Sequence, residues 1–251
     1  MYFTYDDITI YYEKYGSSKK SIIILPGWGN TRKTFDYMIN FLKDYATVYI
    51  LDYPGFGNSK FPDKDLSLYD YSNLIYEWIK YLNIDKPILI GHSFGGRIIT
   101  TLLGYYKYKF DNVIYLNSAG IKPKKKFKSY IYKLLKKLKF ILPKKYKKKW
   151  LNYLFKKYAS TDYKELTPNM YNTFKNIVNL DLKQYLKYIN SKVLLIWGNL
   201  DTSTPLKDAY VMKKEIINSE LIILNNANHF SYLNYPYLVN RIIYEQIKDE
   251  I

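Results

Sequence analysis

A serine in the first half of the chain stands where it could act as a nucleophile. The apolar run at 87–91, typical of a buried strand, ends in Gly91, and after Gly96 apolar residues recur with helical spacing. Between them lies the pattern G-x-S-x-G, here G-H-S-F-G at 91–95. In a nucleophile elbow of this kind, the serine occupies a sharp, strained turn from strand to helix. The pattern therefore predicts that Ser93 presents its hydroxyl above the end of a strand.

A serine hydroxyl needs a general base to become nucleophilic. The chain has two histidines. His92 precedes Ser93 on the elbow, so its side chain is expected to point away from the serine hydroxyl. His229 follows the last predicted strand, at the sheet edge where ligand chemistry gathers in open α/β folds. We therefore predict that His229 is the base.

The base in turn needs an acid that orients it. Asp201 follows the strand that ends at Trp197, so it is expected at the same sheet edge as His229. Proteins with such an elbow carry the three residues in the order serine, acid, histidine, and Asp201 fits the middle place. Asp201 could instead be a turn or cap aspartate. However, Thr204 before Pro205 makes a good helix N-cap, so Asp201 is not needed as the cap.

No rival acid follows the neighbouring strand. That strand, at 112–117, ends in Asn117, which cannot serve as a carboxylate. Asp111, Asp162 and Asp181 lie outside the loops at this edge of the predicted sheet. Asp201 is therefore the predicted acid.

Acyl transfer at such a serine also needs two hydrogen-bond donors for the oxyanion. One is expected to be the backbone N–H of Phe94, the residue after the nucleophile, and the other the N–H of Trp28 in the loop P-G-W-G at 26–29. The side chains of Trp28, Phe94 and Phe230 are also expected to bind substrate. This set of residues implies neither a metal nor an organic cofactor.

Strands that alternate with helices must hold these residues in place. Strands are predicted at 8–15, 21–25, 47–51, 87–91, 112–117, 192–197 and 221–224, and helices at 34–43, at 68–82, after the elbow, and from near 205 and 236. This alternation predicts a parallel sheet covered on both faces. Only helical patterns occur between 121 and 190, so we expect a helical insertion there.

In this order the motifs resemble those of the α/β-hydrolase-fold family, over nearly the whole chain. The resemblance is carried by P-G-W-G at 26–29, D-Y-P-G-F-G-N-S at 52–59, G-H-S-F-G-G at 91–96, W-G-N-L-D at 197–201 and N-H-F at 228–230. It implies a mostly parallel sheet, a hydrolase core at 1–120 and 191–251, and a lysine-rich helical cap at 121–190. Many members have His-Gly where this chain has Pro26-Gly27.

The resemblance also implies a serine hydrolase that cleaves a carboxylic ester of a small to medium apolar acyl group through an acyl-enzyme. Two other reactions use the same three residues: cleavage of a C–C bond in a dienoate and release of N-terminal residues from peptides. An aminopeptidase would need an acidic group for the substrate amine, and residues 121–150 offer none. A hydrolase-fold binding protein or a peripheral membrane protein is the alternative from another class.

Charge and composition narrow the choice further. Of the net charge of +17, 14 units come from lysines at 121–150, a segment without acid, so the other 221 residues carry only +3. Cysteine is absent, which excludes disulfides and thiol catalysis. The N-terminus does not resemble a secretory signal, and no apolar run is long enough to cross a bilayer, so we predict a cytoplasmic location.

The lysine-rich segment at 122–149 is expected to form an amphipathic cap helix. Its apolar face comprises Phe127, Tyr130, Ile131, Leu134, Leu135, Leu138, Ile141 and Leu142, and its lysines include Lys128, Lys133, Lys136, Lys137 and Lys139. The simplest interpretation is a lid with solvated lysines. The alternatives are an anionic membrane surface and an acidic partner or substrate, such as an ester linked to a carrier protein. Nucleic acid is not expected, because no recognition module accompanies the lysines.

Overall fold

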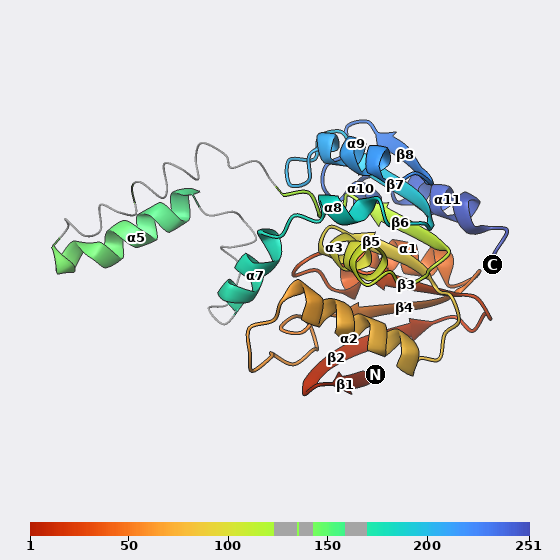
Figure 1. The fold of residues 1–251 in the computed structure, drawn as a ribbon, viewed down its shortest axis with the longest axis horizontal. Coiled ribbons are helices and arrows are strands. Elements are labelled where there is room, and N and C mark those ends of the chain that lie inside the picture. Colours follow the sequence, from red (N-terminus) through yellow and green to blue (C-terminus); the bar gives the residue numbers. More distant parts are fainter. Residues whose placement is uncertain (123–134, 136–142, 159–169) are drawn as a thin grey trace.

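A single mixed sheet organises the molecule (Figure 1). The computed structural model describes residues 1–122, 135, 143–158 and 170–251. Within these residues eight strands pair in the order β1-β2-β4-β3-β5-β6-β7-β8. They are β1 (Tyr2–Tyr5), β2 (Ile8–Tyr15), β3 (Ser21–Leu25), β4 (Thr47–Asp52), β5 (Ile88–His92), β6 (Asn112–Leu116), β7 (Lys192–Gly198) and β8 (Ser219–Leu224). β2 runs antiparallel to β1 and to β4, and all other neighbours are parallel.

The register of the parallel strands brings their carboxyl ends level. Leu116 of β6 pairs with His92 of β5 on one side and with Ile196 of β7 on the other. β7 and β8 then pair as far as Gly198 and Leu224. The loops that follow β5, β6, β7 and β8 therefore leave the sheet at one edge, which is where ligands bind in open α/β sheets.

Helices cover both faces because successive side chains of the central strands point to opposite sides. Ile23 and Leu25 of β3 belong to a cluster with α2 (Leu68–Tyr81), α3 (Phe94–Thr100) and α9 (Leu206–Glu215). Ile22 and Ile24 belong to a cluster with α1 (Asp36–Leu42) and α11 (Pro236–Ile247). All residues of β3, β4, β5 and β6 are buried, as the apolar runs predict.

The predicted strands are all present, with ends shifted by at most about two residues. Four features differ from the prediction, one of which is the short unpredicted helix α10 (Ser231–Asn234). β1 was not predicted; it joins β2 through Asp6 and Asp7, whose φ values of 48° and 61° suit a tight hairpin turn. The helix expected at 34–43 begins as a 3₁₀ turn at Arg32–Phe35 and becomes α1. The helix after the elbow ends in a π-helical turn at Thr101–Tyr105.

The chain between β6 and β7 contains α5 (Lys144–Tyr158), α7 (Tyr171–Val178) and α8 (Lys183–Leu186), and no strand occurs among its described residues. In Figure 1, α5 lies away from the sheet, whereas α7 and α8 lie beside it. The end of α7 is tied to α3, because the buried guanidinium of Arg97 donates to the carbonyl oxygens of Leu180 at 3.0 Å and Val178 at 3.5 Å.

The proposed apolar and lysine faces of the cap helix lie outside the described residues, except for Leu135. The carbonyl oxygen of Leu135 accepts a hydrogen bond from Trp150 Nε1 in α5 at 3.2 Å. The division into a core and a cap at 121–190 stays a prediction. Among the helices that the described residues form, none is both long and apolar enough to span a membrane.

The contact between α3 and β3 depends on a glycine. Gly95 N donates to Pro26 O at 3.0 Å, and a Cβ on Gly95 would lie only 2.0 Å from Leu25 O. We expect Gly95→Ala to lower the free energy of unfolding by about 3 kcal/mol, because the backbone must move. Gly29→Ala is the control: its Cβ would meet only Phe56, at 3.9 Å, and its positive φ costs about 1–2 kcal/mol. Equal losses in urea unfolding would contradict the prediction.

Candidate active site

Ser93 occupies a strained turn at the junction of β5 and α3. Its backbone has φ 48° and ψ −105°, a conformation that costs roughly 1–3 kcal/mol for a residue other than glycine. Hydrogen bonds hold the turn: Ser93 N donates to Leu116 O at 3.2 Å, and Ser93 O accepts from Gly96 N and Ala119 N at 3.1 and 3.0 Å. The half-buried serine is thus fixed to the end of β6 as well as to its own strand.

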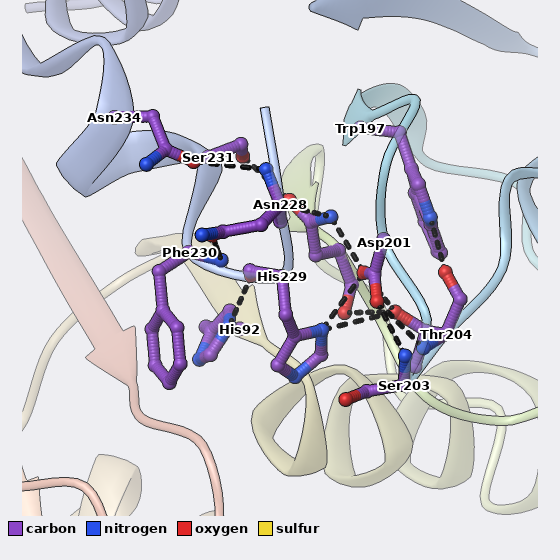
Figure 2. A network of polar contacts seen from close by, with 11 residues as sticks. His92, Trp197, Asp201, Ser203, Thr204, Asn228, His229, Phe230, Ser231 and Asn234 are labelled. Atoms are coloured by element: carbon purple, nitrogen blue, oxygen red, sulfur yellow. Dashed lines mark hydrogen bonds and ion pairs between the residues drawn. The ribbon is translucent and has the colours of Figure 1, made fainter. Parts of the chain in front are cut away.

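His229 and Asp201 meet at the same sheet edge, from the loops after β8 and β7 (Figure 2). His229 Nδ1 lies 2.8 Å from Asp201 Oδ2, and the Asp201 side chain is completely buried. Because a carboxylate only accepts hydrogen bonds, Nδ1 carries the hydrogen. Nε2 of a neutral His229 is then the nitrogen that can accept a proton.

The Asp201 carboxylate accepts hydrogen bonds at both oxygens. Oδ1 accepts from the backbone N–H groups of Ser203 and Thr204 at 2.8 and 2.9 Å. Oδ2 accepts from Thr204 Oγ1 at 2.6 Å and from Asn117 Nδ2 at 2.7 Å, in addition to His229. Burial alone would raise the pKa of Asp201, but the hydrogen bonds and charge of His229, with the Thr204 hydrogen bonds, lower it below its ordinary value.

Thr204 does not cap the following helix, so that expectation was wrong. The N-cap position of α9 is Pro205, and no side chain caps it. The Thr204 hydroxyl instead lies within hydrogen-bond distance of Asp201 Oδ2 and of Asn117 O. The buried carboxylate takes this hydroxyl because a buried charge without donors costs much more than an uncapped N-terminus.

Asn117 joins the loops after β6, β7 and β8. Its Nδ2 donates to Asp201 and lies 3.3 Å from Asn228 O, and its Oδ1 accepts from the Ser231 hydroxyl. Asn117 was not expected in the site because an amide cannot serve as a carboxylate, and neither Thr204 nor Ser231 was predicted there. The position of Asn117 at a strand end is the signal that could have indicated its role.

The two predicted oxyanion donors lie on neighbouring segments, Trp28 on the loop after β3 and Phe94 at the start of α3. The loop after β3 is linked to the elbow by the hydrogen bond from Gly95 N to Pro26 O. In the described part of the chain, neither Trp28 N–H nor Phe94 N–H donates to a protein atom. Stabilisation of an oxyanion requires N–H donors that are not already used, and both of these groups meet that requirement.

The three predicted substrate-binding side chains fall into two groups. The Trp28 ring lies 5.1 Å from that of Phe94 and 5.4 Å from that of Phe174 in α7. Phe230 forms the second group, with its ring 5.5 Å from that of His229.

Among the described residues, no group of three or more acidic, histidine or cysteine side chains could hold a metal ion.

His92 is buried beneath the loop that carries His229. Its Nε2 lies 3.1 Å from the backbone oxygen of His229, as seen in Figure 2. Burial, together with the nearby charge of His229, lowers the pKa of His92 to about 3. His92 therefore stays neutral, and its Nε2 is occupied by a carbonyl oxygen rather than by the serine.

Comparisons with known proteins concern the fold of the whole chain. A family model described as alpha/beta hydrolase fold matches residues 20–236. A pimeloyl-[acyl-carrier protein] methyl ester esterase of Wigglesworthia glossinidia brevipalpis is 30% identical over 93% of this chain and 95% of its own. A 2-hydroxy-6-oxononadienedioate/2-hydroxy-6-oxononatrienedioate hydrolase of Pseudomonas putida is 24% identical over 94% of this chain and 91% of its own. The structure of the esterase EaEST from Exiguobacterium antarcticum matches with a TM-score of 0.76 at 21% identity and covers 97% of both chains, a likeness of fold.

The buried neutral His92 predicts a loss of stability in acid. The unfolded chain has an ordinary histidine pKa of about 6.5, so between about pH 6 and pH 3 it binds one more proton than the folded chain. In this range His92 lowers the free energy of unfolding by about 1.4 kcal/mol for each unit by which the pH falls, and above pH 7 it has no effect. In urea unfolding, the difference in free energy of unfolding between wild type and His92→Gln should therefore change with pH by this slope. A pH-independent difference would contradict the assignment.

Proposed function

The chain belongs to the alpha/beta hydrolase fold family, and from this premise we propose that it is a serine hydrolase that cleaves a carboxylic ester through an acyl-enzyme. The proposed nucleophile, acid and base are Ser93, Asp201 and His229. The observation that carries the proposal is the 2.8 Å hydrogen bond between His229 Nδ1 and Asp201 Oδ2, at the edge of the sheet where Ser93 turns into α3.

In the proposed mechanism, His229 Nε2 takes the proton of Ser93 while Oγ attacks the ester carbonyl carbon. The N–H groups of Trp28 and Phe94 stabilise the oxyanion of the tetrahedral intermediate. When the intermediate collapses, His229 gives the proton to the departing alcohol, and a water molecule then hydrolyses the acyl-enzyme by the same steps. Asp201 holds the imidazole and stabilises its cation.

An aromatic surface beside the proposed oxyanion donors favours an apolar acyl group. Trp28 lies against Phe56, with ring centroids 5.0 Å apart, and Phe174 of α7 packs on the same tryptophan. Met170 belongs to this cluster, and a Cβ on Gly55 would lie 2.8 Å from its sulfur. These contacts between the insertion and the edge of the sheet support a cap at 121–190 that encloses the acyl group.

A second candidate is an ester whose acyl chain is carried by an acidic carrier protein. Two observations favour it: the lysine-rich segment at 121–150 and the relative named as a pimeloyl-[acyl-carrier protein] methyl ester esterase. A basic segment in the enzyme would attract an acidic carrier and raise the rate of encounter. The relative that hydrolyses a dienedioate is less similar, so C–C cleavage stays the weaker alternative.

Substitution of the proposed nucleophile tests the reaction class. Ser93→Ala should abolish labelling by a fluorophosphonate probe and lower the hydrolysis of p-nitrophenyl esters by about 10⁴-fold or more, because the acyl-enzyme cannot form without the Ser93 hydroxyl. Ser17→Ala, in an exposed loop, is the control and should behave as wild type. Full hydrolysis by the Ser93→Ala variant would disprove the serine mechanism.

The carrier-protein candidate has its own test. The methyl ester of an acyl chain on acyl carrier protein should be hydrolysed with a kcat/KM at least about tenfold above that of the free methyl ester, and the advantage should shrink at high salt. Replacement of Lys148 and Lys149 by Gln should reduce the advantage, whereas the same change at the exposed Lys207 and Lys214 should not. An advantage that is absent at low salt would leave free esters as the substrate class.

A further inference from the structure

His92 is a deeply buried polar side chain to which the proposed mechanism gives no task. It is the last residue of β5 and is 1% exposed. Its ring packs among aromatic rings, 5.0 Å from that of Tyr232 and 5.3 Å from that of Phe230. Buried polar groups normally have hydrogen-bond partners, so the two ring nitrogens decide what this residue does.

Only one of the two nitrogens has a partner among the residues that the structure describes. His92 Nε2 lies 3.1 Å from the backbone oxygen of His229. A carbonyl oxygen accepts hydrogen bonds and cannot donate them, so Nε2 carries the hydrogen and donates it. His92 Nδ1 is buried and has no partner among the described residues. The neutral ring is thus a donor aimed at the backbone of the proposed base.

The opposite edge of the same ring borders the loop that carries a proposed oxyanion donor. A Cβ on Gly27 would lie 2.7 Å from His92 Nδ1, so the backbone at Gly27 rests directly against the ring. Trp28, whose N–H is the proposed donor, follows in the chain. His92 is therefore bonded to the Ser93 turn, hydrogen-bonded to the His229 loop and in contact with the Trp28 loop.

No strand pairing joins the serine to the histidine. Ser93 follows β5 and His229 follows β8, and β6 and β7 lie between these two strands in the sheet. The hydrogen bond that His229 Nδ1 donates to Asp201 holds the imidazole, but Asp201 belongs to the β7 side of the sheet. The hydrogen bond of His92 connects the serine side directly to the histidine loop, across 137 residues of sequence.

We propose that His92 is a positioning residue, whose Nε2–H holds the His229 loop at the distance from Ser93 that proton transfer requires. This inference rests on the proposed function. Proton transfer to a base needs hydrogen-bond distance in the reacting complex, and a displacement of about 1 Å can slow a reaction about 10²-fold. Loss of the donor should therefore slow the chemical step and leave substrate binding nearly unchanged.

Three substitutions at one position test the inference in the full chain. His92→Phe keeps a ring of similar size without a donor. His92→Gln places an amide N–H near the position of Nε2, and His92→Asn has an amide too short to reach that position. For each, we would measure the thermal midpoint, the rate of labelling by a fluorophosphonate probe, and kcat and KM for a p-nitrophenyl ester.

We expect His92→Phe and His92→Asn to lower kcat and the labelling rate about 10²-fold with KM nearly unchanged, and His92→Gln to restore most of both. Where the Phe variant does not fold, the comparison of Asn with Gln decides. A folded Phe or Asn variant with the kcat of wild type would overturn the inference. So would a Gln variant as slow as Asn at equal thermal stability, because a purely packing role predicts no rescue by the longer amide.

A spectroscopic measurement separates this inference from the proposed function. In ¹⁵N NMR of the wild type, His92 should show the neutral tautomer with hydrogen on Nε2. Hydrogen on Nδ1 would overturn the inference whatever the activity. A wild type with this tautomer that is not labelled and hydrolyses no ester would instead contradict the proposed function, and the inference with it, while the hydrogen bond itself would stand.

Discussion

The parallel pairing of β5, β6, β7 and β8 is the constraint on which the site depends. Because the four strands end level, the residues that follow them converge, although the serine and the histidine are separated by more than half of the chain. A shift of one residue in any of these ladders would turn each side chain of the shifted strand to the opposite face. Close packing opposes such a shift in β5, β6 and β7, because their side chains on the two faces of the sheet belong to two separate buried clusters.

The buried Asp201 carboxylate imposes a second requirement, a full set of donors. A buried carboxylate without hydrogen-bond donors would be so unfavourable that it would take up a proton and become neutral. Asn117, Thr204 and two backbone N–H groups supply the donors, so His229 is not the sole partner of the acid. An amide at position 117 suits this role better than a carboxylate, because a second negative charge there would raise the pKa of Asp201.

The apolar side of the site is built by contacts between distant segments. Trp28 belongs to the loop after β3, and its ring contacts Phe94 at the elbow and Phe174 of α7. These contacts connect the segments of the proposed oxyanion donors to the insertion. Arg97 of α3 strengthens the same connection, because its guanidinium donates a hydrogen bond to Leu180 O, just after the end of α7. The part of the insertion around α7 is therefore packed against the elbow.

Patterns along the chain were sufficient for most of the fold and for the principal candidates of the site. Apolar runs and helical spacing predicted the central strands, because burial on both faces demands unbroken apolar residues. The elbow motif and the strand ends singled out Ser93, Asp201 and His229, because these positions are defined locally, by the motif or by the end of an element. The hairpin strand β1 was not predicted, because its turn depends on two aspartates with positive φ and its apolar pattern is weak.

Tertiary structure alone decided which polar side chains serve which neighbour. Thr204 has the sequence context of a helix cap but donates to Asp201, and Asn117 reaches that carboxylate across 84 residues of sequence. From the sequence, His92 was predicted only to point away from the serine. The hydrogen bond between its Nε2 and the backbone oxygen of His229 appears only in the folded sheet. The physical reason is the same in each case: local patterns record burial and backbone geometry, whereas the partner of a buried donor depends on which strands lie side by side and in what register.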